Sequence, residues 1–387
     1  MLPFRRVPLA WANLVHNKVK LAASLAGITF AVALMYMEMG FYNALLDGMV
    51  GLLCKFDADL ILTSRARYTI GFKQTFSRRH LNEALQFEDV LAANPVYIET
   101  RIARWRALDS RLQVPVRVVA FRLEDNVFTD REIKARSAAL QGPNTALFDR
   151  SGKASLYGRP RTGDVTELSN RRLHVIGEFG LGADFLNDGN LVMSDRNFLN
   201  YFGDRRRADP QTLPVDIGLI KVRPGTRERV KAALAQALPA SVEVFTKDQF
   251  IETERQFWLR NTPIGYVFKL GMALGFAVGV VICYQILFSE ISSYIREYAT
   301  LLAIGYRRLD LVKVVLLEAF YLAVMGFAGG TAVGFVFYKA NQSITSIPFI
   351  LNPCRVLLVF AFTLLMCVSS ACLVIRKLWS AAPADVF

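Results

Sequence analysis

The chain has 387 residues, of which 53% are hydrophobic and 20% are charged, with a mean hydropathy of +0.30 and a formal net charge of +13. This is too apolar for a wholly soluble protein of this size, so we expect apolar membrane spans joined to a polar domain. The basic residues do not indicate a nucleic-acid partner, because the arginines outside the apolar runs are scattered and have no aromatic stacking pattern beside them.

Residues 1–20 predict a short amphipathic helix at the inner membrane surface, with Trp11 suited to the interface. A plain flanking segment is the alternative. The apolar window at 21–46 follows, and it exceeds the roughly 20 residues that a spanning helix needs. We expect no cleavable signal peptide, because this window starts late, is too long and lacks a small-residue cleavage site.

Residues 47–262 have an ordinary globular composition and predict a large α+β domain. Ser77 is placed to cap a helix over 77–87. Residues 162–179 predict two strands around a turn at Ser169 and Asn170. Other stretches predict strands at 58–64, 112–121, 215–223 and 241–246, with a helix at 227–238.

Three more apolar windows complete a predicted set of four transmembrane helices. They are separated by a charged segment and a short loop and are followed by a tail, giving the order 263–289, 290–310, 311–338, 339–355, 356–375 and 376–387. Lys and Arg flank the spans in 1–20, 290–310 and 376–387, so the positive-inside rule places these segments and both termini in the cytoplasm of an inner, or plasma, membrane protein. The 47–262 domain and the 339–355 loop are then outside.

The sequence gives no positive case for an enzyme, a metal or a cofactor. Residues 150–155, RSGKAS, contain Gly-Lys but lack the first glycine of a phosphate-binding loop and have Ala154 at the hydroxyl position. His16, His80 and His174 fall in unrelated segments, which argues against a zinc site or a histidine-based triad.

Two cysteines, Cys54 and Cys354, lie in segments that we place outside. They either form a disulfide or are unrelated thiols. The other three, Cys283, Cys367 and Cys372, fall inside the apolar windows and suit apolar packing.

Charged residues inside the windows are costly in lipid and often functional. Glu38 and Lys269 either pair with each other or lie on parts of their helices that extend beyond the bilayer. Lys313 is close enough to the inner end of its span to reach the interface. Glu318 lies deeper, and we expect it to have a specific partner.

The 290–304 segment predicts an amphipathic helix that continues the second span. Ser292, Ser293, Arg296, Glu297 and Thr300 fall on one arc, and Ile291, Ile295, Tyr298 and Leu302 fall on the other. Gly305 then suits the residue after the helix end, where positive φ is needed. Asp310 is placed to cap the third span. A rigid charged elbow of this kind suits force transfer, and a stiff loop that only anchors topology is the alternative.

The stretch REYATLLAIGYRRLDLVKVVLLEA, residues 296–319, resembles the R-E-x-A-x-L-x-A-x-G signature of FtsX/MacB-type ABC transporter permeases. The layout of one span, a large domain and three spans is also similar, as is the terminal AAPADVF. The resemblance implies a non-catalytic permease whose elbow docks on a separate ATPase, and it assigns that contact to Arg296, Glu297, Leu301, Gly305, Tyr306, Arg307, Arg308 and Asp310. Thr300 and Tyr306 depart from the family pattern.

More narrowly, residues 7–47, FSRRHLNEALQF and TALFDRSGKASLYG are similar to DevC-type permeases of glycolipid exporters. This resemblance implies a homodimer that works with two ATPase copies, a periplasmic adaptor of the membrane-fusion type and an outer-membrane channel, and that exports a lipid or other amphiphile by mechanotransmission. Two alternatives remain: an FtsX-type regulator of a cell-wall hydrolase, and a membrane-anchored enzyme with its site in the 47–262 domain.

Overall fold

The computed structural model describes residues 9–203, 209, 212–305, 307–347 and 349–380. Tyr306 and the 381–387 tail therefore lie outside the described residues. The chain folds as two units. We call Met1–Asn43, Ile264–Ala340 and Phe349–Phe387 the helical unit, and Ala44–Pro263 with Asn341–Pro348 the globular unit.

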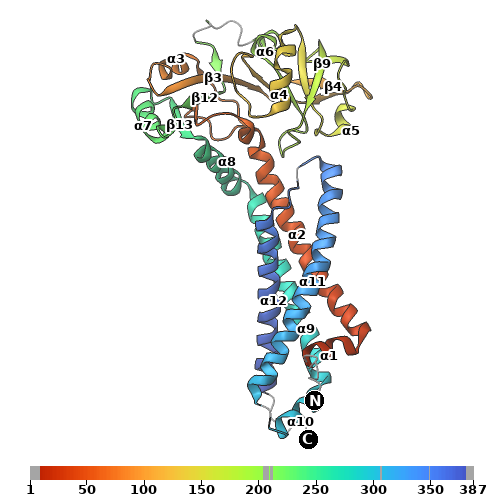
Figure 1. Cartoon of the computed structure of the whole chain (residues 1–387). Helices are drawn as coiled ribbons and strands as arrows, with labels where there is room; N and C mark the ends of the chain where they lie inside the picture. The colour runs from red at the N-terminus through yellow and green to blue at the C-terminus, as the bar shows by residue number, and fades with distance from the viewer. Residues whose placement is uncertain (1–8, 204–208, 210–211, 306, 348, 381–387) are drawn as a thin grey trace, which may run out of the picture. The chain divides into compact units, whose positions relative to one another are not determined.

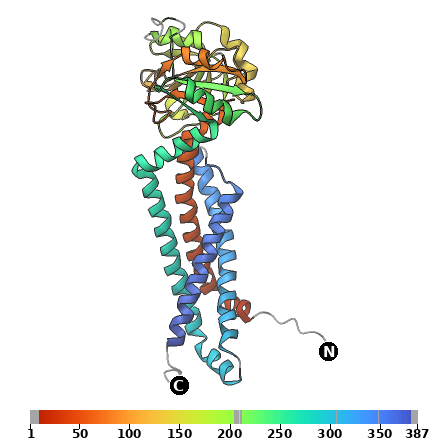
Figure 2. The ribbon, with the colours of Figure 1, turned by 90° about the vertical axis from the view of Figure 1, so that its left-hand side faces the viewer.

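Four long helices are apolar enough to cross a membrane, and Figures 1 and 2 show them running alongside one another in the helical unit. Two shorter helices accompany them. In chain order the six are α1 (Leu9–His16), α2 (Lys18–Lys55), α9 (Pro263–Ser293), α10 (Ile295–Ala303), α11 (Arg308–Thr345) and α12 (Pro353–Ser380). The chain is thus a multi-pass membrane protein with four candidate spans, as the apolar windows predict.

Two of the candidate spans, α2 and α11, are much longer than a bilayer requires. Each has 38 residues, which at 1.5 Å per residue is about 57 Å, compared with about 30 Å of hydrocarbon. Both helices therefore continue well past the membrane, and both enter the globular unit, which begins at Ala44 and includes Asn341–Pro348.

Three glycines spaced four residues apart bring α11 against α2. A Cβ added at Gly326 would lie 2.3 Å from Ile28, one at Gly330 would lie 2.4 Å from Val32, and one at Gly334 would lie 2.9 Å from Tyr36. Small residues at this spacing let helix backbones approach closely, which is a common way for helices to associate in membranes. The sequence analysis missed this stripe, although its spacing in GFAGGTAVGF was visible.

A mixed sheet of eleven strands forms the centre of the globular unit, in the order β13-β1-β12-β3-β6-β10-β7-β9-β8-β4-β5. Neighbouring strands are antiparallel except β6–β10 and β7–β9. The strands are β1 (Leu60–Ser64), β3 (Val90–Glu99), β4 (Arg104–Arg106), β5 (Gln113–Pro115), β6 (Arg117–Phe121), β7 (Thr145–Asp149), β8 (Val165–Leu168), β9 (Arg171–Phe179), β10 (Asn190–Ser194), β12 (Ile217–Val222) and β13 (Val242–Thr246); β2 (Phe76–Ser77) pairs separately with β11 (Pro214–Val215).

Both faces of the central strands are buried, which explains their continuous apolar sequences. Leu60 and Leu62 of β1 pack into one core, whereas Ile61 packs into the other. Figure 1 shows α3 and α7 at the end of the sheet that contains β3, β12 and β13. The helices of this unit are α3 (Arg79–Ala84), α4 (Arg131–Arg136), α5 (Ala154–Tyr157), α6 (Asp195–Tyr201), α7 (Arg227–Ala237) and α8 (Lys247–Asn261), with a 3₁₀ turn at Ser137–Gln141.

The structure confirms the predicted hairpin and corrects two local predictions. Ser169 and Asn170 both have positive φ, 48° and 65°, between β8 and β9, as a tight type I′ turn requires. The single strand predicted at 112–121 is two strands, β5 and β6, which pair with different neighbours on either side of Val116. Ser77 is not the N-cap residue of α3, which is Arg78, but its hydroxyl accepts from the N–H of Arg79, the first residue of the helix, at 3.3 Å.

Candidate coupling segment

The amphipathic helix predicted at 290–304 is interrupted in the structure. The second candidate span, α9, ends at Ser293, and α10 begins at Ile295. The Ser293 hydroxyl donates to the Ser289 carbonyl at 2.8 Å, and such back-bonding tends to bend a helix. Tyr294 lies in the break, and its hydroxyl donates to the carbonyl of Asn13 at 3.4 Å. Thus α10 is a separate short helix joined to α9 by one residue.

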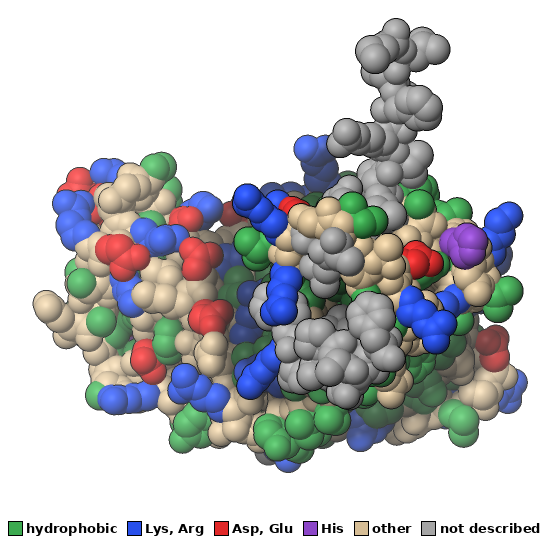
Figure 3. All heavy atoms as spheres, turned by 90° about the horizontal axis from the view of Figure 1, so that it is seen from below, with side chains coloured by type: hydrophobic (Ala, Val, Ile, Leu, Met, Phe, Trp, Pro, Cys, Tyr) green, Lys and Arg blue, Asp and Glu red, His purple; other side chains and the backbone are tan. Residues whose placement is uncertain are grey.

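The described side chains of this segment follow the predicted arcs. Arg296, Glu297 and Thr300 are exposed, whereas Ile291 is buried and Ile295 is half-buried. The side chains of Tyr298, Leu301 and Leu302 lie outside the described part of the chain. Figure 3, the view from below, shows Lys and Arg side chains at several places on the visible face.

Gly305 ends this segment in the conformation that the sequence predicts. Its φ is +105°, which L-residues other than glycine adopt at a cost. The preceding Ile304 N–H donates to the Thr300 carbonyl at 3.1 Å, which closes the last turn of α10. Among the described residues, an added Cβ at Gly305 would have nothing within 4 Å. The need for glycine therefore comes from the backbone and does not come from packing.

Asp310 stabilises the start of α11 from within the helix. Because α11 begins at Arg308, Asp310 is its third residue and does not occupy the N-cap position that we predicted. Its carboxylate accepts from the Arg307 N–H at 3.3 Å and lies 3.4 Å from Lys313 Nζ. This arrangement is the side-chain half of a capping box. It leaves Arg307 and Arg308 exposed, and among the described residues neither has an ion-pair partner.

The N-terminal helix α1 and the residues after it contact α11 and the end of α9. Asn13 donates its amide to Glu318 Oε1 at 3.0 Å, and the rings of Trp11 and Tyr321 meet edge to face at 5.4 Å. Just after α1, Lys20 Nζ donates to the Ser289 carbonyl and to the Ser293 hydroxyl, both at 3.0 Å. Sequence reasoning placed α1 at the membrane surface and missed these contacts, because Asn13 and Glu318 lie 305 positions apart.

The other charged residues of the windows have clear positions. Glu318 is fully buried, and Asn13 is a partner of the kind expected for it. Glu38 and Lys269 do not pair among the ion pairs of the described chain. Lys269 is exposed. The Glu38 carboxylate lies beside Gly271, where an added Cβ would be 2.4 Å from its Oε2 atom. Cys54 and Cys354 are both exposed free thiols.

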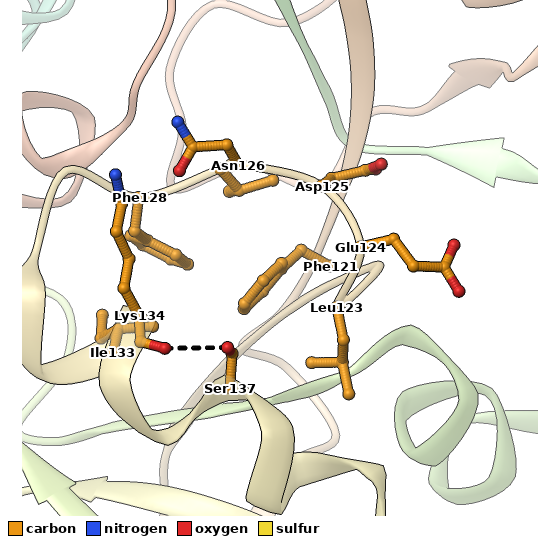
Figure 4. Close-up of a pocket in the computed structure, with 10 residues that line it drawn as sticks. Phe121, Leu123, Glu124, Asp125, Asn126, Phe128, Ile133, Lys134 and Ser137 are labelled. Atoms are coloured by element: carbon orange, nitrogen blue, oxygen red, sulfur yellow. Dashed lines mark hydrogen bonds between the residues drawn. The ribbon is translucent and has the colours of Figure 1, made fainter.

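In the globular unit, a pocket of about 270 Å³ lies at the end of β6 (Figure 4). Phe121, Phe128 and Ile133 supply apolar walls. The polar rim is engaged locally, since Asp125 pairs with Arg122 at 2.7 Å and the Ser137 hydroxyl donates to the Lys134 carbonyl at 2.8 Å (Figure 4). Across the described residues, no three His, Cys, Asp or Glu side chains gather as a metal site would require.

Comparison with known proteins matches a family domain over the part of the chain that contains the candidate coupling segment, residues 296–310. Residues 270–383, which contain α10 and most of the last three candidate spans, match the model of the FtsX-like permease C-terminal domain. This part of the chain is therefore an FtsX-like permease domain. No curated protein matches the chain in sequence.

Two solved structures are similar to the other part of the chain. One is the periplasmic region of MacB from Actinobacillus actinomycetemcomitans, with 11% identity and a TM-score of 0.35, covering 51% of this chain and 93% of that one. The other is the extracellular domain of the noncanonic ABC-type transporter YknZ from Gram-positive bacteria, with 11% identity and a TM-score of 0.34, covering 49% of this chain and 99% of that one.

Proposed function

We propose that this chain is the permease subunit of an ABC exporter of the DevC-like kind, and that the 296–310 segment is its contact with a separate ATPase. The observation that carries the proposal is the exposed, charged α10–Gly305–α11 turn inside the matched FtsX-like domain. Arg296, Glu297, Arg307 and Arg308 present charge without ion-pair partners among the described residues, so they are available to carboxylates and amines on another protein.

The connections of α10 support a role in transmitting movement. One residue joins α10 to α9, and a short turn joins it to α11. Both α2 and α11 are continuous helices that extend from the candidate spans into the globular unit. A push on α10 would therefore move the adjoining ends of α9 and α11 together. Helix α1 would move with α11, because Asn13 is hydrogen-bonded to Glu318.

The proposal includes an orientation and a set of partners. Residues 1–20, 290–310 and 376–387 face the cytoplasm, where the ATPase is, and the globular unit faces outside. The chain works as a homodimer and recruits a periplasmic adaptor and an outer-membrane channel. ATP-driven closure of the ATPases changes the shape of the globular unit, which handles a lipid or other amphiphile on the outer side.

The test is a double charge reversal, Arg307→Glu with Arg308→Glu. Replacing attractive interface charges with repulsive ones should weaken ATPase binding by on the order of a few kcal/mol, which is a hundredfold or more in affinity. Membrane insertion should not change, because the other cytoplasmic segments stay basic. The measurement is the amount of ATPase that co-purifies with the full chain, together with export activity in cells.

The matched control is Arg101→Glu with Arg111→Glu, since both arginines are exposed in the globular unit and the change in net charge is identical. We expect the control to retain the ATPase. If the 307/308 reversal also retains it at wild-type levels and supports export, the segment is only a topological anchor and the proposal is wrong.

A further inference from the structure

A second pocket of the globular unit has a composition that none of the preceding roles uses. Its volume is about 510 Å³. Strand β7, the turn that follows it and α5 form one wall, and Gln342, Ser343 and Ser346 form another part of the lining, the 342–346 wall. The Ser346 carbonyl accepts from the Ala183 N–H at 3.2 Å, which attaches the 342–346 wall to the loop after β9.

The pocket is strongly basic. Arg150, Arg159 and Arg161 line it, and Glu178 is its only acidic lining residue. Arg150 has a partner outside the lining set, Glu132, at 2.7 Å. Arg159 and Arg161 are exposed, and among the described residues no ion pair involves either side chain. Two positive charges in a concave site are thus available to a ligand.

Two other pockets of the described residues in this unit differ in charge. The pocket of Figure 4 has two acidic residues and one basic residue, Glu124, Asp125 and Lys134. The third pocket, of about 680 Å³, has Arg65 and Lys231 together with Glu243. Among these three pockets of the described residues, the one that Arg159 and Arg161 line therefore has the largest excess of positive charge.

The frame that positions these arginines is fixed by buried polar contacts. Asp149, at the end of β7, is fully buried and accepts from the N–H groups of Ser151, Leu181 and Gly182 at 2.9–3.0 Å. The Tyr157 hydroxyl donates to the Pro115 carbonyl at 2.5 Å. After Tyr157, Gly158 and Arg159 both have positive φ, 79° and 44°, so the chain turns sharply and presents Arg159. The site is built before any ligand arrives, which reduces the entropic cost of binding.

The position of the 342–346 wall at the end of α11 gives the expected level of the pocket relative to the lipid bilayer. Residues 319–338 of α11 contain no charged side chain, and Lys339 is the first one after them. Gln342 follows Lys339 by three residues, which is about 4.5 Å along a helix. We therefore expect this wall to lie at the level of the lipid headgroups, just beyond the hydrocarbon.

We propose that this pocket binds the phosphate, or a like anionic headgroup, of a membrane amphiphile. The guanidinium groups of Arg159 and Arg161 would contact the anion, since arginine presents paired donors that match phosphate oxygens. Ser151 and Gln342 supply neutral polar groups at the rim. The inference rests on the part of the proposed function in which the globular unit handles an amphiphile, and it can fail separately, because the pocket would bind its ligand even if the 296–310 segment contacted no ATPase.

The test uses the full chain in an uncharged detergent. Binding of short-chain phosphatidylglycerol, short-chain phosphatidylcholine and inorganic phosphate is measured by titration calorimetry and by native mass spectrometry. We expect phosphatidylglycerol to bind at least tenfold more tightly than phosphatidylcholine and than inorganic phosphate. The variant Arg159→Asn with Arg161→Gln should lose at least tenfold in affinity for phosphatidylglycerol; asparagine is chosen because it tolerates positive φ.

Arg101→Gln with Arg111→Gln removes the same charge elsewhere in the globular unit and should change this affinity less than twofold. Arg161→Glu alone, at an exposed position, gives a second measurement if the double variant does not fold. Equal binding by the pocket variants and the wild type would overturn the site. Binding of inorganic phosphate as tight as that of the lipid would overturn the assignment to a membrane amphiphile.

Discussion

Arginine plays different parts in the two units. In the globular unit, Arg67 lies 3.1 Å from Asp216, and both side chains are only 1% exposed. Arg67 also donates to the carbonyls of Ile70 and Gln74. In the helical unit, Arg307 and Arg308 stand exposed beside a turn. The first arrangement organises a loop over the sheet, and the second leaves charge available to another molecule.

The difference shows how a net charge of +13 has to be divided before it can be interpreted. A buried, paired arginine adds little to the surface potential, and losing its cation would leave an acid in the protein interior. An exposed arginine adds little to folding and much to recognition. Burial, which the sequence does not state, separates the two kinds.

The same substitution in both units gives the largest expected contrast. Arg67→Met removes the cation beside buried Asp216 and should lower the free energy of unfolding of the globular unit by about 3–5 kcal/mol. Arg308→Met should change stability by no more than about 0.5 kcal/mol. The measurement is hydrogen exchange of the Ile98 amide, which donates to Asp216 at 2.8 Å, in the full chain. Similar losses in the two variants would refute the contrast.

The next largest loss of stability is expected at Gly330, which lets α11 pack closely against α2. Gly330→Ala places a Cβ 2.4 Å from Val32 and should destabilise the packing of α11 on α2 by about 1–3 kcal/mol. Thermal unfolding of the full chain in detergent measures the loss. The control is Gly203→Ala, where an added Cβ meets no described residue within 4 Å. A Gly330→Ala protein as stable as this control would mean that α11 and α2 do not pack as described.

A smaller loss of stability than at Gly330 is expected at Gly305, where the backbone alone imposes glycine. Gly305→Ala should cost about 1 kcal/mol at φ +105°, which is roughly a fivefold faster exchange of the Ile304 amide. Gly305→Asn should cost less, because asparagine tolerates positive φ better than alanine. Unchanged exchange in the alanine variant would show that the turn does not depend on this conformation.

The sequence predicted the features that depend on composition and on near neighbours. Four apolar runs predicted the four long helices, and the short polar pair Ser169 and Asn170 predicted the β8–β9 hairpin. Gly305 was predicted to have positive φ because it follows an amphipathic segment. In each case the determining residues lie within a few positions of one another, so their pattern is visible along the chain.

Features that depend on distant contacts were not predicted. The break at Tyr294 accompanies a hydrogen bond to Asn13, 281 positions away, and Glu318 meets Asn13 across 305 positions. The division of 112–121 into β5 and β6 reflects different neighbours in the sheet. The basic pocket combines residues near 150–161 with residues near 342–346, which no local pattern connects.

The junction between the sheet and the helices α2 and α8 determines how a mechanical load reaches the sheet. The chain leaves α2 and soon enters β1, while β13 leads directly into α8 and then α9. These two strands are antiparallel neighbours, and Leu60 at the start of β1 faces Thr246 at the end of β13. Both helices therefore attach at the same end of one strand pair. Just beyond that end, Lys247 Nζ donates to the Phe56 carbonyl at 2.6 Å.

A load that pulls α2 and α8 apart would fall on the first hydrogen bonds of this pair, at Leu60 and Thr246. The strands would therefore separate one residue pair at a time from that end. A load that drives both helices in the same direction would not separate the strands at all. The β1–β13 pair would therefore resist a load that moves α2 and α8 in the same direction, and it would open under a load that separates them. The hydrogen bond from Lys247 Nζ to the Phe56 carbonyl lies at the end of the pair where opening would begin, so it would oppose that opening.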